Sequence, residues 1–245
     1  MLLVGLTGGI ATGKSTVSTL LRTEHHLPII DADLLARRAV EPNTAAFRAI
    51  LATFGQDLAV HDSTGRITGF DRTELGKRVF SGDEAARKKL NAIVHPAVRW
   101  LMVRAVLWEW LVVGSRVVVL DIPLLFESGL DRFVGMSVVV ATKPETQLER
   151  LVGREGQRLS REDAQGRIAS QWQIEDKVRL ADVVIENDGS REELEQHIQL
   201  VVREQFSRGW LWSLLMRVPP LGLTVAMYVF LRRLWRRKSR DKKTT

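Results

Sequence analysis

The amino-acid sequence predicts an α/β fold with a doubly wound, mostly parallel sheet. Residues 116–120 and 137–141 form two nearly continuous β-branched runs, which are typical of central parallel strands buried on both faces. Between such runs, apolar residues recur with the spacing of a helix. Strands that alternate with helices indicate a doubly wound α/β order. With 245 residues, of which 45% are hydrophobic, the chain is long enough for one sizeable core and an appendage.

The first half of the chain begins with an apolar segment that runs directly into a glycine-rich turn. We expect this segment to be a strand, and helical spacing begins only after the glycines. A later helical stretch is interrupted at His95-Pro96, where we expect a break or a new first turn because proline has no backbone N–H. The elements expected here are strands at residues 2–6 and 28–30 and helices at residues 14–23, 33–54 and 83–113.

The second half of the chain continues the alternation of strand and helix. Two strands are the β-branched runs already described, a third apolar run follows near the end, and the last helix has an amphipathic pattern. The elements expected here are strands at residues 116–120, 137–141 and 182–185 and helices at residues 145–151 and 191–206. In such a sheet, ligands bind outside the carboxyl ends of the strands, so the loops at that edge are the first candidates for function.

A glycine-rich turn between the first strand and the first helix fits the pattern G-x-x-x-x-G-K-[ST] of P-loop NTPases. Its glycines let backbone N–H groups point at phosphate oxygens, and the helix N-terminus adds its positive dipole end. Lys14 is expected to reach the β and γ phosphates of ATP, and the Ser15 hydroxyl to bind Mg²⁺. Packing alone can also explain such a turn, but packing does not require a lysine and a serine there. The residues predicted to bind the nucleotide are Gly8, Gly9, Ile10, Ala11, Thr12, Gly13, Lys14, Ser15 and Thr16.

Carboxylates follow two of the expected strands, at the edge of the sheet where ligands bind. Asp33 is a candidate general base for an acceptor hydroxyl, and it is equally suited to cap the helix that follows. Asp121 ends an apolar strand, where a Walker-B-type carboxylate supports Mg²⁺; the alternative is a turn residue at a strand end. Glu127 follows in a loop that could line the acceptor site. With the glycine-rich turn, these carboxylates make phosphoryl transfer the expected chemistry.

Arginines are concentrated in and just beyond the helix expected at residues 145–151. They are Arg150, Arg154, Arg158 and Arg161. Because guanidinium groups suit phosphate, this segment predicts a lid over about residues 154–171. The alternative is a solvated basic helix face, although the spacing of four between the first two arginines puts both on one side of the helix.

Composition narrows the classes of function. The sequence has no cysteine, which excludes disulfides, a thiolate zinc site and a cysteine nucleophile. No second histidine lies at metal-ligand spacing from His95, so we expect a packed or acceptor-contacting side chain there. The net charge of +7 comes from residues 209–245, which hold nine Lys or Arg and one acid, whereas residues 1–208 hold 27 basic and 28 acidic residues. A nearly neutral body argues against nucleic acid and favours a membrane as partner.

Several short motifs follow one another in order along the chain. They are LTGGIATGKST at residues 6–16, Asp31-Ala32-Asp33 with Arg37, His95-Pro96, DIPLLFE at residues 121–127 and QLER at residues 147–150. This set resembles the dephospho-CoA kinase family over residues 2 to about 206. The resemblance implies ATP-dependent phosphorylation of the ribose 3′-hydroxyl of dephospho-CoA, the last step of coenzyme A synthesis, on a P-loop core of the nucleoside-monophosphate-kinase type.

The resemblance also implies roles for individual residues. Asp33 is then the base, Lys14 acts with it in catalysis, and Arg154 falls in the lid. The lid turn is longer than is usual in the family, which leaves Arg158 as an alternative to Arg154 for the phosphate contact. A nucleoside monophosphate kinase and a catalytically silent, nucleotide-binding membrane scaffold remain alternative functions.

The sequence is expected to comprise a kinase domain at residues 1–207 and a membrane-associated tail at residues 208–245. Within the kinase domain, the acceptor-binding helical region is expected at about residues 33–113. The tail comprises an apolar stretch at residues 209–231, which carries a single charge, and a basic end at residues 232–245. Its length suffices to cross a membrane, and its basic end suits anionic headgroups.

The arrangement of this tail is left open by the sequence. A single span would put the basic end across the membrane from the ATP-binding domain, against the positive-inside tendency. A hairpin at Pro219-Pro220, a shallow insertion beside Arg217 and a packed soluble helix are the alternatives. The last four residues resemble a dilysine signal of endoplasmic-reticulum proteins, and the basic flank also suits the mitochondrial outer membrane. We expect the kinase domain to face the cytosol, since no signal peptide precedes the first strand.

Overall fold

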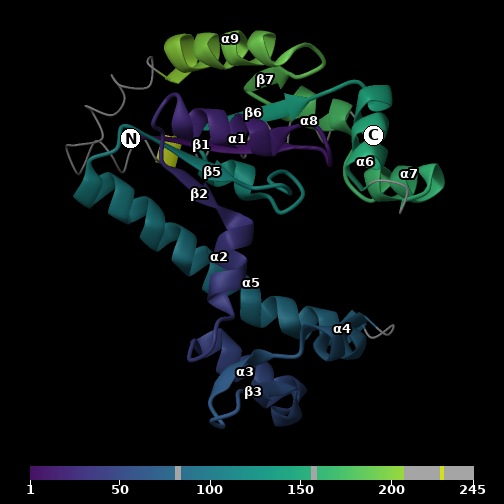
Figure 1. Ribbon diagram of the computed structural model, residues 1–245. Coiled ribbons are helices and arrows are strands. Elements are labelled where there is room, and N and C mark those ends of the chain that lie inside the picture. The colour runs from purple at the N-terminus through teal and green to yellow at the C-terminus, as the bar shows by residue number, and fades with distance from the viewer. Residues whose placement is uncertain (81–83, 156–158, 207–226, 229–245) are drawn as a thin grey trace. The chain divides into compact units, whose positions relative to one another are not determined.

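The computed structural model describes residues 1–80, 84–155, 159–206 and 227–228 and shows two compact units. The first unit comprises Met1–Ile29 together with the chain from Glu109 onward, and the second comprises Ile30–Trp108 (Figure 1). Each unit has its own hydrophobic core. The predicted tail at residues 209–231 and 232–245 lies, apart from residues 227 and 228, outside the described part of the chain.

A five-stranded sheet in the order β2-β5-β1-β6-β7 has four of its strands in the first unit, and β2 spans the point in the chain where the second unit begins. Its strands are β1 (Leu2–Gly8), β2 (Ile29–Asp31), β5 (Val117–Asp121), β6 (Met136–Ala141) and β7 (Val183–Glu186). β1 pairs in parallel with β5 and with β6, and β6 pairs in parallel with β7. Parallel neighbours require crossover connections, which helices supply here. The predicted doubly wound α/β fold is confirmed.

Helices cover both faces of this sheet. The helices of this unit are α1 (Lys14–Thr23), α6 (Pro144–Glu155), α7 (Arg161–Ala169), α8 (Ile174–Leu180) and α9 (Arg191–Val201), with short helical turns at Glu109–Val113, Leu130–Phe133 and Val202–Phe206. Val138 and Val140 of β6 pack in one cluster with α1 and α9, which Figure 1 labels. Val139, between them, packs with Ile174 of α8 instead. This alternation buries both faces of β6, as its continuous apolar sequence predicts.

The second unit is mainly helical and contains a small antiparallel pair of strands. Its elements are α2 (Ala32–Ala39), α3 (Ala45–Phe54), a 3-10 turn (Gln56–Leu58), β3 (Ala59–His61), β4 (Ile67–Phe70), α4 (Arg72–Phe80) and α5 (Glu84–Trp108). Phe47, Ile50, Leu58 and Leu75 belong to its buried core. The β3–β4 pair was not predicted, because strands of three and four residues are too short for alternation to be recognisable.

Two sequence predictions about this unit need correction. The segment expected as one helix from residue 33 to 54 is two helices, and α3 starts afresh at Thr44, whose side chain accepts a hydrogen bond from the N–H of Phe47. The expected break at His95-Pro96 is wrong, because α5 continues through Pro96. Residues just before the proline, Ile93 and Val94, pack on the unit's core, so tertiary contacts outweigh the lost backbone hydrogen bond.

One helical stretch of the described residues, Glu84–Val113, is long and apolar enough to cross a membrane by length and composition alone. Its mean hydropathy reaches 1.2. Core helices of soluble proteins can meet the same criterion, and several of its side chains, Trp100, Trp108 and Leu111 among them, are exposed.

Candidate active site

The glycine-rich turn connects the end of β1 to the start of α1. Gly13 is the N-cap of α1 and has φ 87°, in the left-handed region that favours glycine. The cap makes no side-chain hydrogen bond, and the first turn of α1 contains no acid. This leaves the N-terminus of α1, with its positive dipole end, suited to bind an anion.

Close packing explains the glycine at the end of β1. A Cβ on Gly8 would lie 2.7 Å from the Thr12 hydroxyl and 2.8 Å from the carbonyl oxygen of Val140. The second of these is backbone of the neighbouring strand and cannot move aside cheaply. Gly8 therefore lets the loop leave the sheet directly beside β6.

Three polar side chains from later elements hold the backbone of the turn. Gln147 of α6 donates from Nε2 to the Ile10 carbonyl at 2.7 Å, and Asn187 donates from Nδ2 to the Thr12 carbonyl at 2.9 Å. The side chain of Gln171 accepts from the Ile10 N–H at 3.1 Å. Gln147 and Asn187 are buried, so their bonds are shielded from water. None of these residues was predicted to support the turn, because the turn itself carries no sign of its distant partners, and Gln147 was noted only as part of the QLER motif.

Lys14 and Asp121 meet in an ion pair at the carboxyl end of the sheet. The side chain of Lys14 is 20% exposed and that of Asp121 is 8% exposed. The β1–β5 register places Asp121 opposite Leu6, one strand away from the turn. The following loop is fixed to β1, because the Thr7 hydroxyl donates to the carbonyl of Pro123 at 2.8 Å. The structure thus brings together two residues that the sequence had predicted for phosphate and metal.

A second ion pair in the same unit joins a fully buried lysine to a glutamate whose side chain is 16% exposed. Lys177 of α8 is 0% exposed, and its Nζ lies 2.7 Å from Oε1 of Glu127. The same Nζ donates to the Gly8 carbonyl at 3.4 Å. Glu127 was predicted for the acceptor site, whereas Lys177 was missed, because a single lysine in an amphipathic helix gives no signal of burial.

The predicted lid arginines differ in position. Arg150 is partly buried, and its Nη1 lies 4.0 Å from the position that a Cβ on Gly13 would occupy. Arg154 and Arg161 are exposed, near the end of α6 and at the start of α7. Arg158 lies outside the described residues. Among the predicted lid arginines that the structure describes, Arg150 thus lies near the phosphate-binding turn, and the role of Arg154 stays a prediction.

Asp33 belongs to the second unit, where it lies exposed in the first turn of α2. Asp31 is the N-cap of this helix, and its Oδ1 accepts hydrogen bonds from the N–H groups of Asp33 at 2.8 Å and Leu34 at 3.0 Å. Capping by Asp33, the alternative left open by the sequence, is therefore wrong. Its role as a base stays a prediction.

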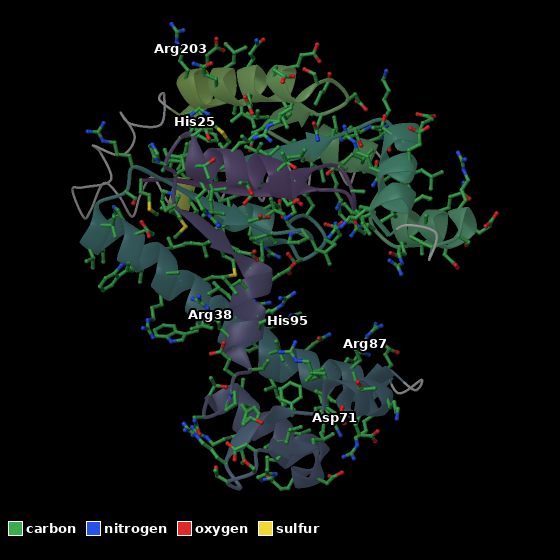
Figure 2. All side chains as sticks on the ribbon, in the orientation of Figure 1. His25, Arg38, Asp71, Arg87, His95 and Arg203 are labelled. Atoms are coloured by element: carbon green, nitrogen blue, oxygen red, sulfur yellow. The ribbon has the colours of Figure 1, made fainter. Side chains whose placement is uncertain are left out.

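His95, the other residue singled out in this unit, is exposed on α5 (Figure 2). It is therefore not a packed core histidine. Within the described part of the chain, no group of three His, Cys, Asp or Glu side chains could hold a metal ion by itself.

These features define a class of protein. A parallel sheet, a glycine-rich turn at a helix N-terminus, a lysine in the turn and a strand-end carboxylate together make a P-loop nucleotide-binding protein. The family model for dephospho-CoA kinase (CoaE) matches residues 2–193, so the chain belongs to the dephospho-CoA kinase family. The family resemblance seen in the sequence is confirmed.

Relatives from distant organisms agree with this assignment. Dephospho-CoA kinase of Geobacillus kaustophilus is 48% identical over 204 residues, covering 83% of this chain and 96% of the relative. Dephospho-CoA kinase CAB5 of Saccharomyces cerevisiae is 40% identical over 248 residues, covering 100% of this chain and 99% of the relative. A dephospho-CoA kinase domain-containing protein of Danio rerio is 47% identical over 199 residues, with 81% and 82% covered.

Solved structures show the same fold. TT1252 from Thermus thermophilus has a TM-score of 0.66 and 35% sequence identity, covering 83% of this chain and 97% of that chain. Dephospho-CoA kinase from Campylobacter jejuni has a TM-score of 0.62 and 29% identity, covering 82% of this chain and 96% of that chain.

Proposed function

We propose that this chain transfers the γ-phosphoryl group of ATP to the ribose 3′-hydroxyl of dephospho-CoA, giving coenzyme A and ADP. This is the final step of coenzyme A biosynthesis and makes the chain a kinase with an alcohol acceptor. The observation that carries the proposal is the pairing of Lys14 with Asp121 beside the glycine-rich turn, in a chain that the dephospho-CoA kinase family model matches from residue 2 to 193.

The turn and its neighbours bind the triphosphate in this proposal. Backbone N–H groups of the turn and the N-terminus of α1 contact phosphate oxygens, and Lys14 neutralises charge on the β and γ phosphates. Arg150, which lies near Gly13, adds a guanidinium group, and Arg154 is the candidate from the end of α6. The charge that develops in the transition state is thereby stabilised by groups fixed in advance.

Mg²⁺ is part of the same proposal. Ser15, exposed near the start of α1, and the carboxylate of Asp121 are oxygen donors of the kind that Mg²⁺ prefers beside substrate phosphates. They would hold the ion or its water ligands, and the ion would neutralise charge on the phosphates. The rest of its coordination shell would then come from the nucleotide and water.

Asp33 is the proposed general base. The oxygen of the 3′-hydroxyl attacks the γ-phosphorus, the bond to the β-phosphate oxygen breaks, ADP leaves, and the hydroxyl proton passes to the Asp33 carboxylate. Two observations support this role: the Asp31-Ala32-Asp33 motif of the family resemblance, and the exposed position of Asp33 on a helix that Asp31 caps.

The test is a phosphoryl-transfer assay on the full chain with ATP and several acceptors. We expect conversion of dephospho-CoA, much weaker reaction with AMP or CMP, and no detectable product with Lys14→Ala. Preference for AMP or CMP would indicate a nucleoside monophosphate kinase instead. Absence of product from every acceptor at high protein concentration would indicate a silent nucleotide-binding scaffold, and undiminished activity of Lys14→Ala would contradict the mechanism.

We also propose that residues 209–245 attach the kinase to a membrane, with the kinase domain facing the cytosol at the endoplasmic reticulum or the mitochondrial outer membrane. The apolar stretch and the basic end support this, and the family model ends at residue 193, before the tail begins. The yeast relative aligns over 100% of this chain, so its match includes the tail.

Membrane attachment can be measured by flotation of the full chain with vesicles. We expect binding to vesicles that contain anionic lipid and weaker binding after Arg232, Arg233, Arg236 and Arg237 are all replaced by glutamine. Equal flotation of both proteins would mean that the basic end does not contribute. Full-chain localisation in cells, with markers for both organelles, distinguishes the two membranes.

A further inference from the structure

Lys177 is the charged side chain that the first unit buries most completely among the described residues, with 0% exposed. Lysine is almost never fully buried unless it is paired, because removing an ammonium group from water is costly. Lys177 has two partners: its Nζ lies 2.7 Å from Oε1 of Glu127 and 3.4 Å from the carbonyl oxygen of Gly8. Both partners lie at the edge of the sheet that carries the glycine-rich turn and Asp121, so Lys177 is buried beside the candidate active site.

Hydrophobic packing fixes the position of Lys177 beside Glu127. Ile174 of α8 packs with Phe126 and Val139 on one face of the sheet. Phe126 directly precedes Glu127 and Ile174 lies one helical turn before Lys177, so the same contact aligns the two charged side chains. Apart from the ion pair with Lys177, neither carboxylate oxygen of Glu127 accepts a hydrogen bond from the described residues. Lys177 is thus the partner that keeps this carboxylate charge compensated.

The hydrogen bond from Lys177 to the Gly8 carbonyl is one of three similar bonds from side chains to carbonyls of the turn. The carbonyls of Gly8, Ile10 and Thr12, at alternate positions of the turn, accept hydrogen bonds from Lys177, Gln147 and Asn187 respectively. A carbonyl oxygen that faced a triphosphate would repel it, whereas an N–H group attracts it. Side-chain donors that turn these carbonyls toward the protein therefore favour the arrangement that presents N–H groups to phosphate.

We propose that Lys177 is a positioning residue for ATP binding, an inference that rests on the proposed function. Its ammonium group joins the first carbonyl of the phosphate-binding turn to the loop that runs from Asp121 to Glu127. It also neutralises the Glu127 carboxylate, which would otherwise repel the phosphates of the nucleotide. Lys177 touches neither substrate in this scheme and acts through the backbone of Gly8 and the charge of Glu127.

The alternative is a counter-ion that only stabilises the fold, and a double-mutant cycle separates the two. Lys177→Met leaves Glu127 buried and unpaired, so both stability and ATP binding are expected to fall. Lys177→Met combined with Glu127→Gln removes both charges and should recover most of the melting temperature. If Lys177 positions the turn, the double variant still has a KM for ATP about tenfold or more above that of Glu127→Gln alone, because the hydrogen bond from a charged donor is lost.

Two further variants complete the experiment. Arg179→Met changes an exposed cation on the same helix and should leave KM for ATP and the melting temperature unchanged. Lys177→Arg keeps the charge and a donor for the Gly8 carbonyl, so KM for ATP should rise less than in the methionine variant. If Lys177→Met does not fold, the double variant and Lys177→Arg still test the proposal.

Binding of a fluorescent ATP analogue is measured for each variant beside the kinetics. A double variant that matches Glu127→Gln in both KM for ATP and analogue affinity would overturn the proposal and leave Lys177 as a counter-ion. Analogue affinity does not depend on the acceptor. If the wild-type chain does not phosphorylate dephospho-CoA, the proposed function fails on its own, and the analogue measurements still decide the role of Lys177.

Discussion

Gly13→Ala should destabilise the protein by an amount that the structure makes calculable. Gly13 has φ 87°, and the left-handed conformation costs a residue with a Cβ about 1–2 kcal/mol. The new Cβ would lie 2.1 Å from Nδ2 of Asn187, so the amide must move. That movement breaks its hydrogen bond to the buried Thr12 carbonyl and adds about 1–2 kcal/mol. The expected loss is about 2–4 kcal/mol in the free energy of unfolding.

Urea unfolding followed by circular dichroism measures this loss, provided the slope with urea is the same for both proteins. Gly153→Ala is the matched control, because Gly153 lies inside α6 and an added Cβ would meet nothing within 4 Å. That variant should gain about 0.5–1 kcal/mol from its lower backbone entropy in the unfolded chain. If the free energy of unfolding of Gly13→Ala lies within about 0.5 kcal/mol of the wild-type value, neither the backbone strain nor the displacement of Asn187 has the expected cost.

A second double-mutant cycle, with Asn187, tests separately whether the added methyl group displaces the Asn187 amide. In an Asn187→Ala background the added methyl group has no amide to displace, so Gly13→Ala should cost only the conformational strain. The difference between the two backgrounds should be about 1–2 kcal/mol, the contribution assigned to the hydrogen bond. Equal costs in both backgrounds would show that Asn187 accommodates the methyl group without losing its contact with Thr12.

Three further predictions concern carboxylates. Asp33→Asn should lower kcat by about 10²–10⁴-fold and leave stability unchanged. Asp31→Ala removes the cap of α2 and should cost about 1 kcal/mol of stability. If both variants lose kcat to a similar extent, Asp33 is not the general base. Asp121→Asn should raise the half-saturating Mg²⁺ concentration about 10–100-fold, measured at constant ATP. The hydrogen bond from Arg78 holds the pKa of Asp57 below its usual value. This stabilisation is present above the unfolded pKa and is lost as pH falls through the lower folded pKa, so acid titration should destabilise the wild type more than Asp57→Asn, and parallel curves would contradict it.

The sequence predicted the sheet well because its signals are local. The strand from Val117 to Asp121 and the strand from Met136 to Ala141 are β-branched runs buried on both faces, and α1 has the predicted bounds. The two helix predictions that were wrong in the second unit failed for a related reason. Whether a helix crosses Pro96, or starts again at Thr44, depends on tertiary packing and capping rather than on periodicity.

In the candidate site, too, local motifs could be predicted from the sequence, whereas contacts that depend on the folded structure could not. Lys14 and Asp121 lie in short motifs whose chemistry is readable, and the structure brings them into contact. The helix cap was ambiguous from sequence, since Asp31 and Asp33 are both good capping residues two positions apart. Only the observed hydrogen bonds to Asp31 decide between them.

The residues that hold the phosphate-binding turn come from far along the chain, and this has a consequence for interpreting variants. Gln147, Lys177 and Asn187 contact Ile10, Gly8 and Thr12 across separations of 137, 169 and 175 residues. No local pattern around the turn can indicate such partners, because folding alone brings them together. The turn motif specifies which atoms can meet a phosphate, and Gln147, Lys177 and Asn187 fix the direction of its carbonyls. Substitutions of these three residues should therefore change ATP binding even though none of them touches a substrate.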